Sequence, residues 1–318
     1  MKKIFNIFLG ISTLIFCLSI FNTASALNVV FSEDRPDLRT LDPRITQSRH
    51  EEMIIVQMFD QLISADSNGN LYPGLAKSWD VSSDGLHYTF NLRDDVTFHD
   101  GTKFNAAAVK VTFDSIVDPE TGSQGAVDIL GPYASSDVVD EYTVRVNFSR
   151  RYGSALSAFT ETELSIVSPT ALDSLGNDGF GMSPVGTGPF MFTNWEANKK
   201  VEMVKNPDYN WAPEYMDGSG PSKVDTLTYR LIKDTSTRVA ALESGEVDIA
   251  ELVPPLDMKR FDGSGKLSTI VGTVSGLPYS AFLNTTTGHF QDIKVRQAFF
   301  YSLDRVKMTN DLFFGYAE

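Results

Sequence analysis

The feature that most constrains the fold is a strictly alternating segment at residues 86–93. One face of this segment carries only apolar side chains, at Leu86, Tyr88, Phe90 and Leu92. The residues between them are polar, and the turn signal Asp84-Gly85 comes directly before the segment. Alternation with a period of two predicts a β-strand that is buried on one face and exposed on the other.

The first 26 residues have the pattern of a cleaved secretory signal. Lys2 and Lys3 form a basic start, residues 4–21 are mainly apolar, and Ala24-Ser25-Ala26 is a small-x-small cleavage site. The alternative is a membrane anchor, since about 18 apolar residues can span a bilayer. Small residues follow the apolar stretch closely and no basic cluster follows it, so we predict cleavage after Ala26. The mature protein would then be soluble and periplasmic.

Composition excludes several classes of protein. The chain has 41 acidic and 27 basic residues, a net charge of −14. Such an acidic surface repels phosphate backbones, so nucleic acid is not an expected partner. Cys17 is the only cysteine and lies within the predicted signal, so the mature protein would hold neither disulfides nor thiol ligands. Nothing after residue 26 is apolar for long enough to cross a membrane.

Alternating strand and helix patterns predict an α/β fold. Strands are expected at residues 28–32, 142–148, 190–195, 201–205, 226–232 and 247–252. Helices are expected at 51–63, after the N-cap Asn105 with Val109, Phe113 and Ile116 on the inner face, and from Asp234 or Thr235 to Gly245. The Gly- and Ser-rich residues 170–185 suggest a boundary loop.

Five short motifs follow one another along the chain. They are the block at residues 72–101, Gly186-Thr187-Gly188-Pro189-Phe190, Asn206-Pro207-Asp208-Tyr209-Asn210-Trp211, Ala241-Leu242-Glu243-Ser244-Gly245-Glu246 and Val295-Arg296-Gln297-Ala298. In this order they resemble the extracytoplasmic solute-binding proteins of family 5, which serve peptide and nickel ABC importers. The resemblance covers nearly all of residues 28–318.

The resemblance implies a two-lobed α/β clamp of the type II periplasmic-binding class (cluster C), with an extra domain inserted in the first lobe. The first lobe would comprise residues 27–59 and 185–265, and the inserted domain residues 60–184. Residues 266–318 would begin a second lobe that is largely missing. We therefore expect a truncated gene model, a partial sequence or a frameshift, rather than a compact relative that never had the lobe.

The resemblance also implies a function. The protein would be the binding component of an ABC importer, a monomer without a cofactor that captures di- or oligopeptides by cleft closure. It would deliver them to permease subunits in the inner membrane. On the same scaffold a nickel chelate, glutathione, an opine or a sugar remain alternatives, as does a sensory or chaperone-like role. An exported hydrolase is disfavoured because no catalytic motif is present.

Ligand-binding candidates come from three segments. The loop after Asp42-Pro43 aligns with a cleft-facing loop of the family and contributes Thr46, Gln47, Ser48 and Arg49. Their hydroxyl, amide and guanidinium groups suit a peptide-like backbone or a carboxylate. Gln124 and Gly125 would line the outer cleft, and Phe282 would offer a stacking surface or pack in the core.

The histidines do not predict a metal site. His50, His87, His99 and His289 show neither H-x-x-x-H nor H-E-x-x-H spacing. Because His87 falls on the polar face of a strand and His99 in a turn, we expect solvated side chains and no bound metal.

Overall fold

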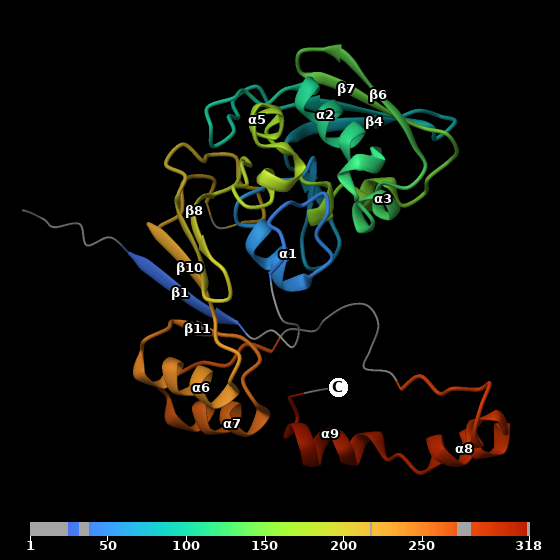
Figure 1. Ribbon diagram of the computed structural model, residues 1–318, viewed down its shortest axis with the longest axis vertical. Coiled ribbons are helices and arrows are strands. Elements are labelled where there is room, and N and C mark those ends of the chain that lie inside the picture. Colours follow the sequence, from blue (N-terminus) through green and yellow to red (C-terminus); the bar gives the residue numbers. More distant parts are fainter. Residues whose placement is uncertain (1–24, 32–37, 217, 272–280, 317–318) are drawn as a thin grey trace, which may run out of the picture.

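A computed structural model describes residues 25–31, 38–216, 218–271 and 281–316. The described chain forms a body, from which an arm made of helices α8 and α9 extends at the bottom of Figure 1. Residues 1–24, which carry most of the predicted signal, lie outside the described residues. In the part of the chain that is described, each helix is too short or too polar to cross a membrane.

Strands and helices are interspersed along the chain, with runs of strands separated by helices, in a mixed α/β fold. The strands are β1 (Ala26–Phe31), β2 (Ile63–Ala65), β3 (Leu71–Pro73), β4 (Ala76–Val81), β5 (His87–Leu92), β6 (Tyr133–Asp140), β7 (Thr143–Phe148), β8 (Phe190–Glu196), β9 (Lys200–Lys205), β10 (Thr226–Leu231) and β11 (Ile249–Ala250). The α-helices are α1 (Arg49–Ile55), α2 (Ala106–Val117), α3 (Gly125–Leu130), α4 (Ala155–Ala158), α5 (Pro169–Phe180), α6 (Thr235–Ser244), α7 (Pro255–Ser264), α8 (Ile293–Tyr301) and α9 (Arg305–Phe313). Short 3₁₀ turns are η1 (Pro119–Thr121), η2 (Thr162–Leu164) and η3 (His289–Gln291).

The mixed five-stranded sheet has the order β11-β1-β10-β9-β8. Strand β1 runs parallel to both of its neighbours, with Val29 opposite Tyr229 on one side and Ile249 on the other. Strand β9 is antiparallel to both of its neighbours, β10 and β8. The strands predicted at 190–195, 201–205 and 226–232 are thereby confirmed, whereas the one predicted at 247–252 is shortened to β11.

The antiparallel four-stranded sheet has the order β4-β5-β7-β6 and lies at the top of Figure 1 with α2 and α3. The alternation in β5 is confirmed, because Tyr88, Phe90 and Leu92 are buried. Helix α2 packs against β6 and β7. Its N-cap Asn105 accepts a hydrogen bond from the Ala108 amide, as predicted, and its inner face is fully buried at Val109, Phe113 and Ile116.

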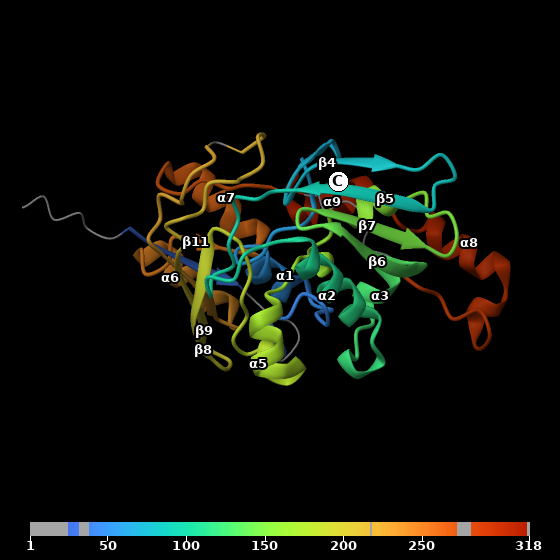
Figure 2. The same ribbon diagram turned by 90° about the horizontal axis from the view of Figure 1, so that it is seen from above.

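Two hydrophobic cores correspond to these two sheets. One core is formed by residues from Leu62 to Ile166 together with Tyr209 and Trp211. The other is formed by residues from Val29 to Phe59 and from Val167 to Tyr229. Figure 2 shows the corresponding sheets side by side, with β8, β9 and β11 apart from β4 to β7. The division into lobes and an inserted domain stays a prediction.

Asp60 lies in the chain between Phe59, which belongs to one core, and Leu62, which belongs to the other. Oδ2 accepts hydrogen bonds from Thr187 Oγ1 at 2.8 Å and Trp211 Nε1 at 3.0 Å. Oδ1 accepts one from Tyr209 Oη at 3.2 Å. Burial raises the pKa of the Asp60 carboxyl, although the three donors oppose the shift. Asp60 therefore ties the segment between α1 and β2 to the segments before β8 and after β9.

The prediction of a helix at residues 51–63 is correct only as far as Ile55. Helix α1 ends at Ile55, and Ile63 belongs to β2. The Met58 carbonyl accepts a hydrogen bond from the Gly188 amide, and the Gln57 carbonyl accepts one from the Phe190 amide. These bonds to a distant segment replace helical ones, so the apolar i, i+4, i+7 spacing does not continue as a helix.

The boundary loop predicted at 170–185 is also wrong. Residues 169–180 form helix α5, which Pro169 begins and Ser168 caps by accepting a hydrogen bond from the Ala171 amide. Gly176 has φ of 66° and ψ of 178°, a non-helical conformation that divides α5 into two short helical segments. Gly176 thus marks a kink between two helical segments.

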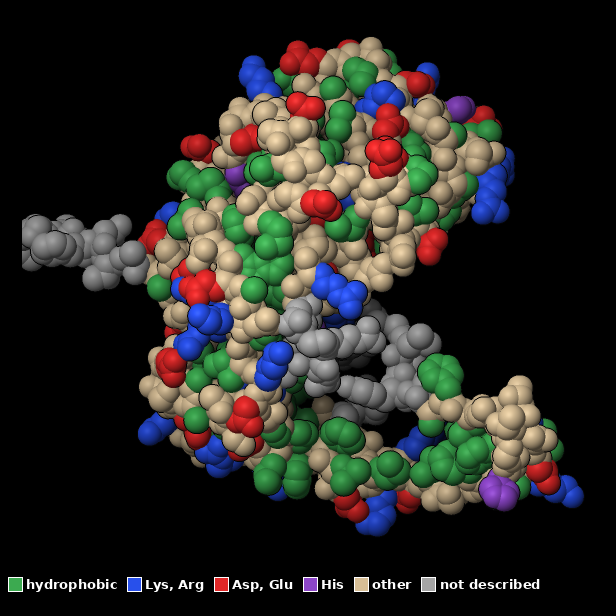
Figure 3. Space-filling model, in the orientation of Figure 1, with side chains coloured by type: hydrophobic (Ala, Val, Ile, Leu, Met, Phe, Trp, Pro, Cys, Tyr) green, Lys and Arg blue, Asp and Glu red, His purple; other side chains and the backbone are tan. Residues whose placement is uncertain are grey.

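The arm differs from the body in its burial. None of the described residues of α8 and α9 is buried. Figure 3 shows hydrophobic side chains along the arm and a hollow between the arm and the body. The end of the arm contacts the body. Lys259 Nζ, in α7, lies over the ring of Phe314, which directly follows α9, at 5.0 Å from the ring centroid.

Candidate functional site

The loop that enters α1 is held by Glu51, which is 2% exposed. Its Oε1 accepts hydrogen bonds from the backbone amides of Arg39 at 2.6 Å and Thr40 at 3.3 Å. Its Oε2 accepts one from Thr46 Oγ1 at 2.6 Å. Thr46 is itself only 1% exposed. The hydroxyl predicted to bind a ligand therefore ties the loop to α1.

A buried ion pair holds the start of the same loop. Arg44 donates from Nε and Nη2 to the two carboxylate oxygens of Asp42, at 3.0 and 2.6 Å, and both side chains are fully buried. Arg44 also donates to Asn177 Oδ1 in α5 at 3.2 Å and lies over the Phe180 ring. Burial of two paired charges is tolerated only in such a bidentate, bonded geometry. The loop is therefore rigidly placed against α5.

Two predicted binding residues from distant parts of the chain meet at this loop. Gln47 Nε2 donates to Gln124 Oε1 at 2.9 Å, and both amides lie at the surface. Gly125 starts α3 against the Thr46 carbonyl, which would lie 3.6 Å from a Cβ at that position. The structure thus brings Gln47 next to Gln124, which lies 77 positions further along the chain, and to its neighbour Gly125.

The remaining predicted residues take no part in the contact between Gln47 and Gln124. Ser48 precedes α1 and makes no side-chain capping bond there, and Arg49 is exposed at the first residue of that helix. Phe282 is 90% exposed, before the arm. Its side chain is therefore not packed in a core.

The carboxyl ends of β1, β10 and β11 carry a second polar cluster. His50 stacks on Phe31 with ring centroids 5.7 Å apart and an interplanar angle of 24°. Its Nε2 lies 3.8 Å from Glu251 Oε2, and Glu251 directly follows β11. Tyr229 packs edge-on against Phe31, and burial, followed by the Glu251 charge, raises its pKa to about 12. In open α/β sheets, the carboxyl edge of parallel strands is the usual place for a ligand.

Arg238 fixes the backbone around this cluster. Its Nη1 donates to the carbonyls of Ile232 and Lys233 at 3.0 and 3.1 Å, and its Nη2 donates to the Leu252 carbonyl at 3.3 Å. One side chain that is 2% exposed thereby connects the loops that follow β10 and β11. Leu252 has φ of 50°, a conformation that costs a non-glycine residue about 1–2 kcal/mol.

His99 is not solvated, contrary to the prediction from sequence. Its Nε2 is hydrogen-bonded to the Gly188 carbonyl at 2.9 Å, and its backbone amide donates to the Gly186 carbonyl. Burial lowers the pKa of the imidazole to about 4. His99 is thus a neutral structural residue next to the Gly-Thr-Gly turn. His87 matches the expectation of a polar face better, since it bonds Asn147 across the sheet.

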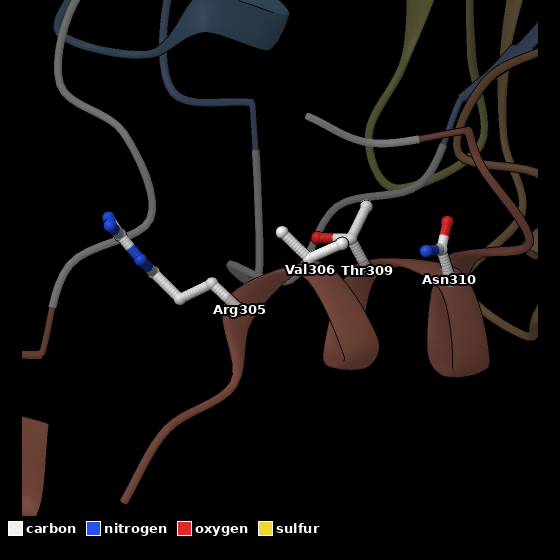
Figure 4. Close-up of a pocket in the computed structure, with 4 residues that line it drawn as sticks. All are labelled: Arg305, Val306, Thr309 and Asn310. Atoms are coloured by element: carbon white, nitrogen blue, oxygen red, sulfur yellow. The ribbon is translucent and has the colours of Figure 1, made fainter. Parts of the chain in front are cut away.

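A pocket on the arm is a surface feature. Arg305, Val306, Thr309 and Asn310 project from one face of α9, as Figure 4 shows. Val306 is 72% exposed, so these side chains do not enclose a site. Among the described residues, no three His, Cys, Asp or Glu side chains gather closely enough to hold a metal.

Sequence reasoning missed the two side chains at the sheet edge. His50 was expected to be solvated, and Glu251 was not singled out. The available signal was the position of Glu251 at the end of a strand that follows the Ala241-to-Glu246 motif. A side chain at the end of one strand can form a binding site only together with side chains at the ends of neighbouring strands. Which strands are neighbours is decided by the order of the strands in the sheet.

The sequence model described as "Bacterial extracellular solute-binding proteins, family 5 Middle" matches residues 70–318. The glutathione-binding protein GsiB of Pectobacterium atrosepticum is 32% identical over 278 residues, which are 87% of this chain and 52% of the relative. GsiB of Escherichia coli K12 is 29% identical over 97% of this chain and 58% of its own length. The chain therefore spans a little over half the length of these relatives.

Solved structures with the same fold include NikZ of Campylobacter jejuni in complex with Ni(L-His). It superimposes with a TM-score of 0.74 at 26% identity, over 92% of this chain and 56% of that one. DppA of Helicobacter pylori in complex with peptide STSA gives a TM-score of 0.73 at 24% identity, over 92% and 59%. These likenesses confirm the predicted α/β fold of the type II periplasmic-binding class.

Proposed function

This chain belongs to family 5 of the bacterial extracellular solute-binding proteins, and from that premise we propose that it captures peptides for an ABC importer. Cleft closure would sequester the peptide from water, and the closed form would be presented to permease subunits in the inner membrane. The protein acts as a periplasmic monomer after cleavage of its signal behind Ala26. It binds its ligand and does not transform it.

The observation that carries the peptide proposal is the amide pair of Gln47 and Gln124. The bond between them uses one N–H of Gln47 and the oxygen of Gln124. Gln47 Oε1 and the Gln124 amino group are left to accept and to donate. A peptide main chain offers one N–H and one carbonyl per residue, which matches this pair. Gly125, beside it, allows another backbone to come close.

In the proposed arrangement of domains, the amide pair lies between two domains. Gln47 would belong to the first lobe, at residues 27–59 and 185–265, and Gln124 to the inserted domain, at residues 60–184. Residues 266–318 would begin the second lobe, which would close over the ligand. Thr46 then acts as support for Gln47, while Ser48 and Arg49 stay candidate ligand contacts. Phe282 stays a candidate for stacking from the second lobe.

Glutathione is the second candidate ligand. The GsiB proteins to which the chain is similar are named for binding it. Glutathione is itself peptide-like and would use the same amide pair. The nickel complex of histidine, found in the NikZ structure, is a third ligand for comparison.

Calorimetric titration of the purified protein tests the proposal. The titrants are Ala-Ala, Ala-Ala-Ala, reduced glutathione and Ni(L-His), and small-angle scattering measures closure by a decrease in the radius of gyration. We expect saturable binding and closure with at least one of the first three. Binding of Ni(L-His) alone would contradict the proposal. Chromatography of the same mixtures would detect cleaved peptide and so tests the hydrolase alternative.

Gln124→Ala tests the amide pair directly. Loss of a neutral hydrogen bond costs about 0.5–1.5 kcal/mol, which corresponds to a weakening of affinity by up to about tenfold. Gln291→Ala is the matched control, because its amide donates only to the local Thr286 carbonyl beside α8. If the Gln124→Ala variant and the unchanged protein bound the same peptide with equal affinity, the amide pair would not be part of the binding site.

A further inference from the structure

The Asp60 carboxylate has lost much of its water without gaining a counter-charge. Among the described residues, no lysine, arginine or histidine forms an ion pair with it. Arg93 acts on it from a distance, because the Arg93 guanidinium is bound to Asp95 through hydrogen bonds of 2.9 and 2.7 Å. Asp42, by contrast, is neutralised by Arg44 in direct contact. A desolvated carboxylate without a counter-charge is costly and needs a physical explanation.

The same carboxylate can still accept another partner. An ionised carboxylate has about four lone-pair sites. Thr187 and Trp211 occupy Oδ2, whereas Oδ1 accepts one long hydrogen bond, of 3.2 Å, from Tyr209 Oη. Oδ1 therefore has room for one more donor or for a cation.

A small cavity adjoins this carboxylate. Its volume is about 20 Å³, and about 10–15 Å³ is enough for one particle of the size of water. Two of the lining side chains supply neutral oxygens. Gln61 donates from Nε2 to Ser165 Oγ at 2.9 Å, which leaves its Oε1 available, and Ser64 Oγ is hydrogen-bonded to Tyr215 Oη at 2.8 Å. The complete lining is Asp60, Gln61, Ser64, Gly74, Trp211 and Pro213.

Gly74 keeps the cavity open. A Cβ at this position would lie 2.6 Å from the Gln61 carbonyl oxygen and 3.0 Å from the Leu62 carbonyl oxygen. The strand that contains Leu71–Pro73 is thereby able to approach the segment after Asp60 closely. The cavity is thus lined by oxygen atoms on one side and closed by backbone on the other.

We propose that this cavity binds a small monovalent metal cation such as Na⁺, which neutralises the Asp60 carboxylate. One carboxylate together with neutral oxygens matches a single positive charge, and hard cations prefer oxygen ligands. A divalent or transition metal fits less well, since no three His, Cys, Asp or Glu side chains gather within the described ranges. A water molecule would fill the volume but leave the charge uncompensated.

The proposed ion would stabilise the folded body. Asp60 ties the segment between α1 and β2 to the segments before β8 and after β9, so an ion bound there belongs to the folded state only. A ligand that binds the folded but not the unfolded chain raises the Tm by mass action. Sodium and potassium salts should therefore stabilise the protein more than a salt of a bulky cation at equal ionic strength.

Thermal unfolding in sodium, potassium and choline chloride at pH 7.5 tests the site. Choline is too large for the cavity but screens surface charge equally at the same ionic strength. With the ion at about ten times its Kd, we expect a Tm about 2–4 °C higher in an alkali salt than in the choline salt. A gain in either alkali salt supports the site. Equal Tm values in all three salts would assign the cavity to water and overturn the proposal.

Two variants and ²³Na NMR make the test specific to Asp60. The unchanged protein should broaden the ²³Na line in a saturable way. Asp60→Asn keeps the shape of the side chain and removes its charge, so it should abolish both the broadening and the Tm gain. Asp94→Asn is the matched control, because that carboxylate pairs with Lys77 at the surface, at 3.0 Å. Absence of broadening, or broadening that persists in Asp60→Asn, would overturn the proposal.

Ser64→Ala is a further variant in case Asp60→Asn does not fold. It removes one neutral oxygen from a half-buried position and leaves the carboxylate in place. We expect a weaker affinity for Na⁺, seen as a shift of the saturation curve to higher NaCl concentration. A curve equal to that of the unchanged protein would overturn the site. These measurements use no peptide, so their outcome is independent of the proposed function.

Discussion

The body and the arm contain helices of similar local design but opposite burial. Helix α6 in the body is capped by Asp234, which accepts a hydrogen bond from the Thr237 amide at 2.7 Å. Helix α9 in the arm is capped by Asp304, which accepts one from the Lys307 amide at 2.9 Å. Yet α6 buries Arg238, Val239 and Ala241, whereas none of the described residues of α9 is buried.

The difference shows that capping and packing are separate contributions. A cap satisfies the free amides of a first turn and so decides where a helix starts. Most of the stability of a helix in a protein comes from packing one face against other elements. The arm has the first contribution and largely lacks the second. Substitutions in the body should therefore change the free energy of unfolding of the whole protein more than substitutions in the arm.

The largest expected difference is between two phenylalanines. Phe113 in α2 is fully buried and contacts the rings of Phe159 and Tyr133, while Phe300 in α8 is 58% exposed. Phe113→Ala should lower the free energy of unfolding by about 3–5 kcal/mol through lost burial and a cavity. Phe300→Ala should lower it by less than about 0.5 kcal/mol. Urea unfolding followed by tryptophan fluorescence measures both changes. Equal losses of unfolding free energy in the two variants would contradict the difference in packing between the body and the arm.

A second difference concerns two histidines. In the body, burial lowers the pKa of His99 from 6.5 to about 4, whereas His289 before the arm is exposed. Between these two pH values the unfolded chain binds more protons at residue 99 than the folded one, so acid favours unfolding. Stability from this group is fully present above pH 6.5 and is lost as the pH falls towards 4, by about 2–3 kcal/mol at pH 4.5.

His99→Gln should remove this part of the pH dependence, because glutamine does not titrate. Urea unfolding at pH 4.5, 5.5, 6.5 and 7.5 measures the slope, with His289→Gln as the matched control. The control should keep the slope of the unchanged protein. If His99→Gln also kept it, the imidazole would not be the group responsible.

The smallest expected difference concerns the two caps. Asp234→Ala should lower the free energy of unfolding by about 1 kcal/mol, since α6 unfolds together with the body. Asp304→Ala should leave global unfolding unchanged and reduce the protection of α9 amides from hydrogen exchange. A global loss of similar size for both variants would show that the arm unfolds together with the body.

Local patterns sufficed for several elements. The alternation of β5, the cap and inner face of α2, and the end of α6 at Gly245 with φ of 75° all agree with the sequence. Each depends on interactions within a few residues, such as a side-chain cap or a glycine that adopts a left-handed conformation. The motif order also predicted the family, since the model of family 5 matches residues 70–318.

Two errors came from different causes. At Gln57 and Met58 the backbone carbonyls accept hydrogen bonds from the Phe190 and Gly188 amides, and no local pattern reveals such a distant partner. A Cβ at Gly186 would lie 2.1 Å from the Met58 carbonyl oxygen, so the close approach itself depends on glycine. For α5 the signal was present in Ser168-Pro169, but the glycines that follow were given more weight.

The sequence by itself determined the local elements, the family and the separate candidates Gln47, Gln124 and Gly125. Tertiary structure alone decided that Gln47 meets Gln124, that Thr46 is turned inward to Glu51, and that Glu251 faces His50 at the sheet edge. The physical reason is distance along the chain. Caps, turns and alternation act over a few residues, whereas a binding site depends on sheet order and packing, which bring together residues such as His50 and Glu251, 201 positions apart.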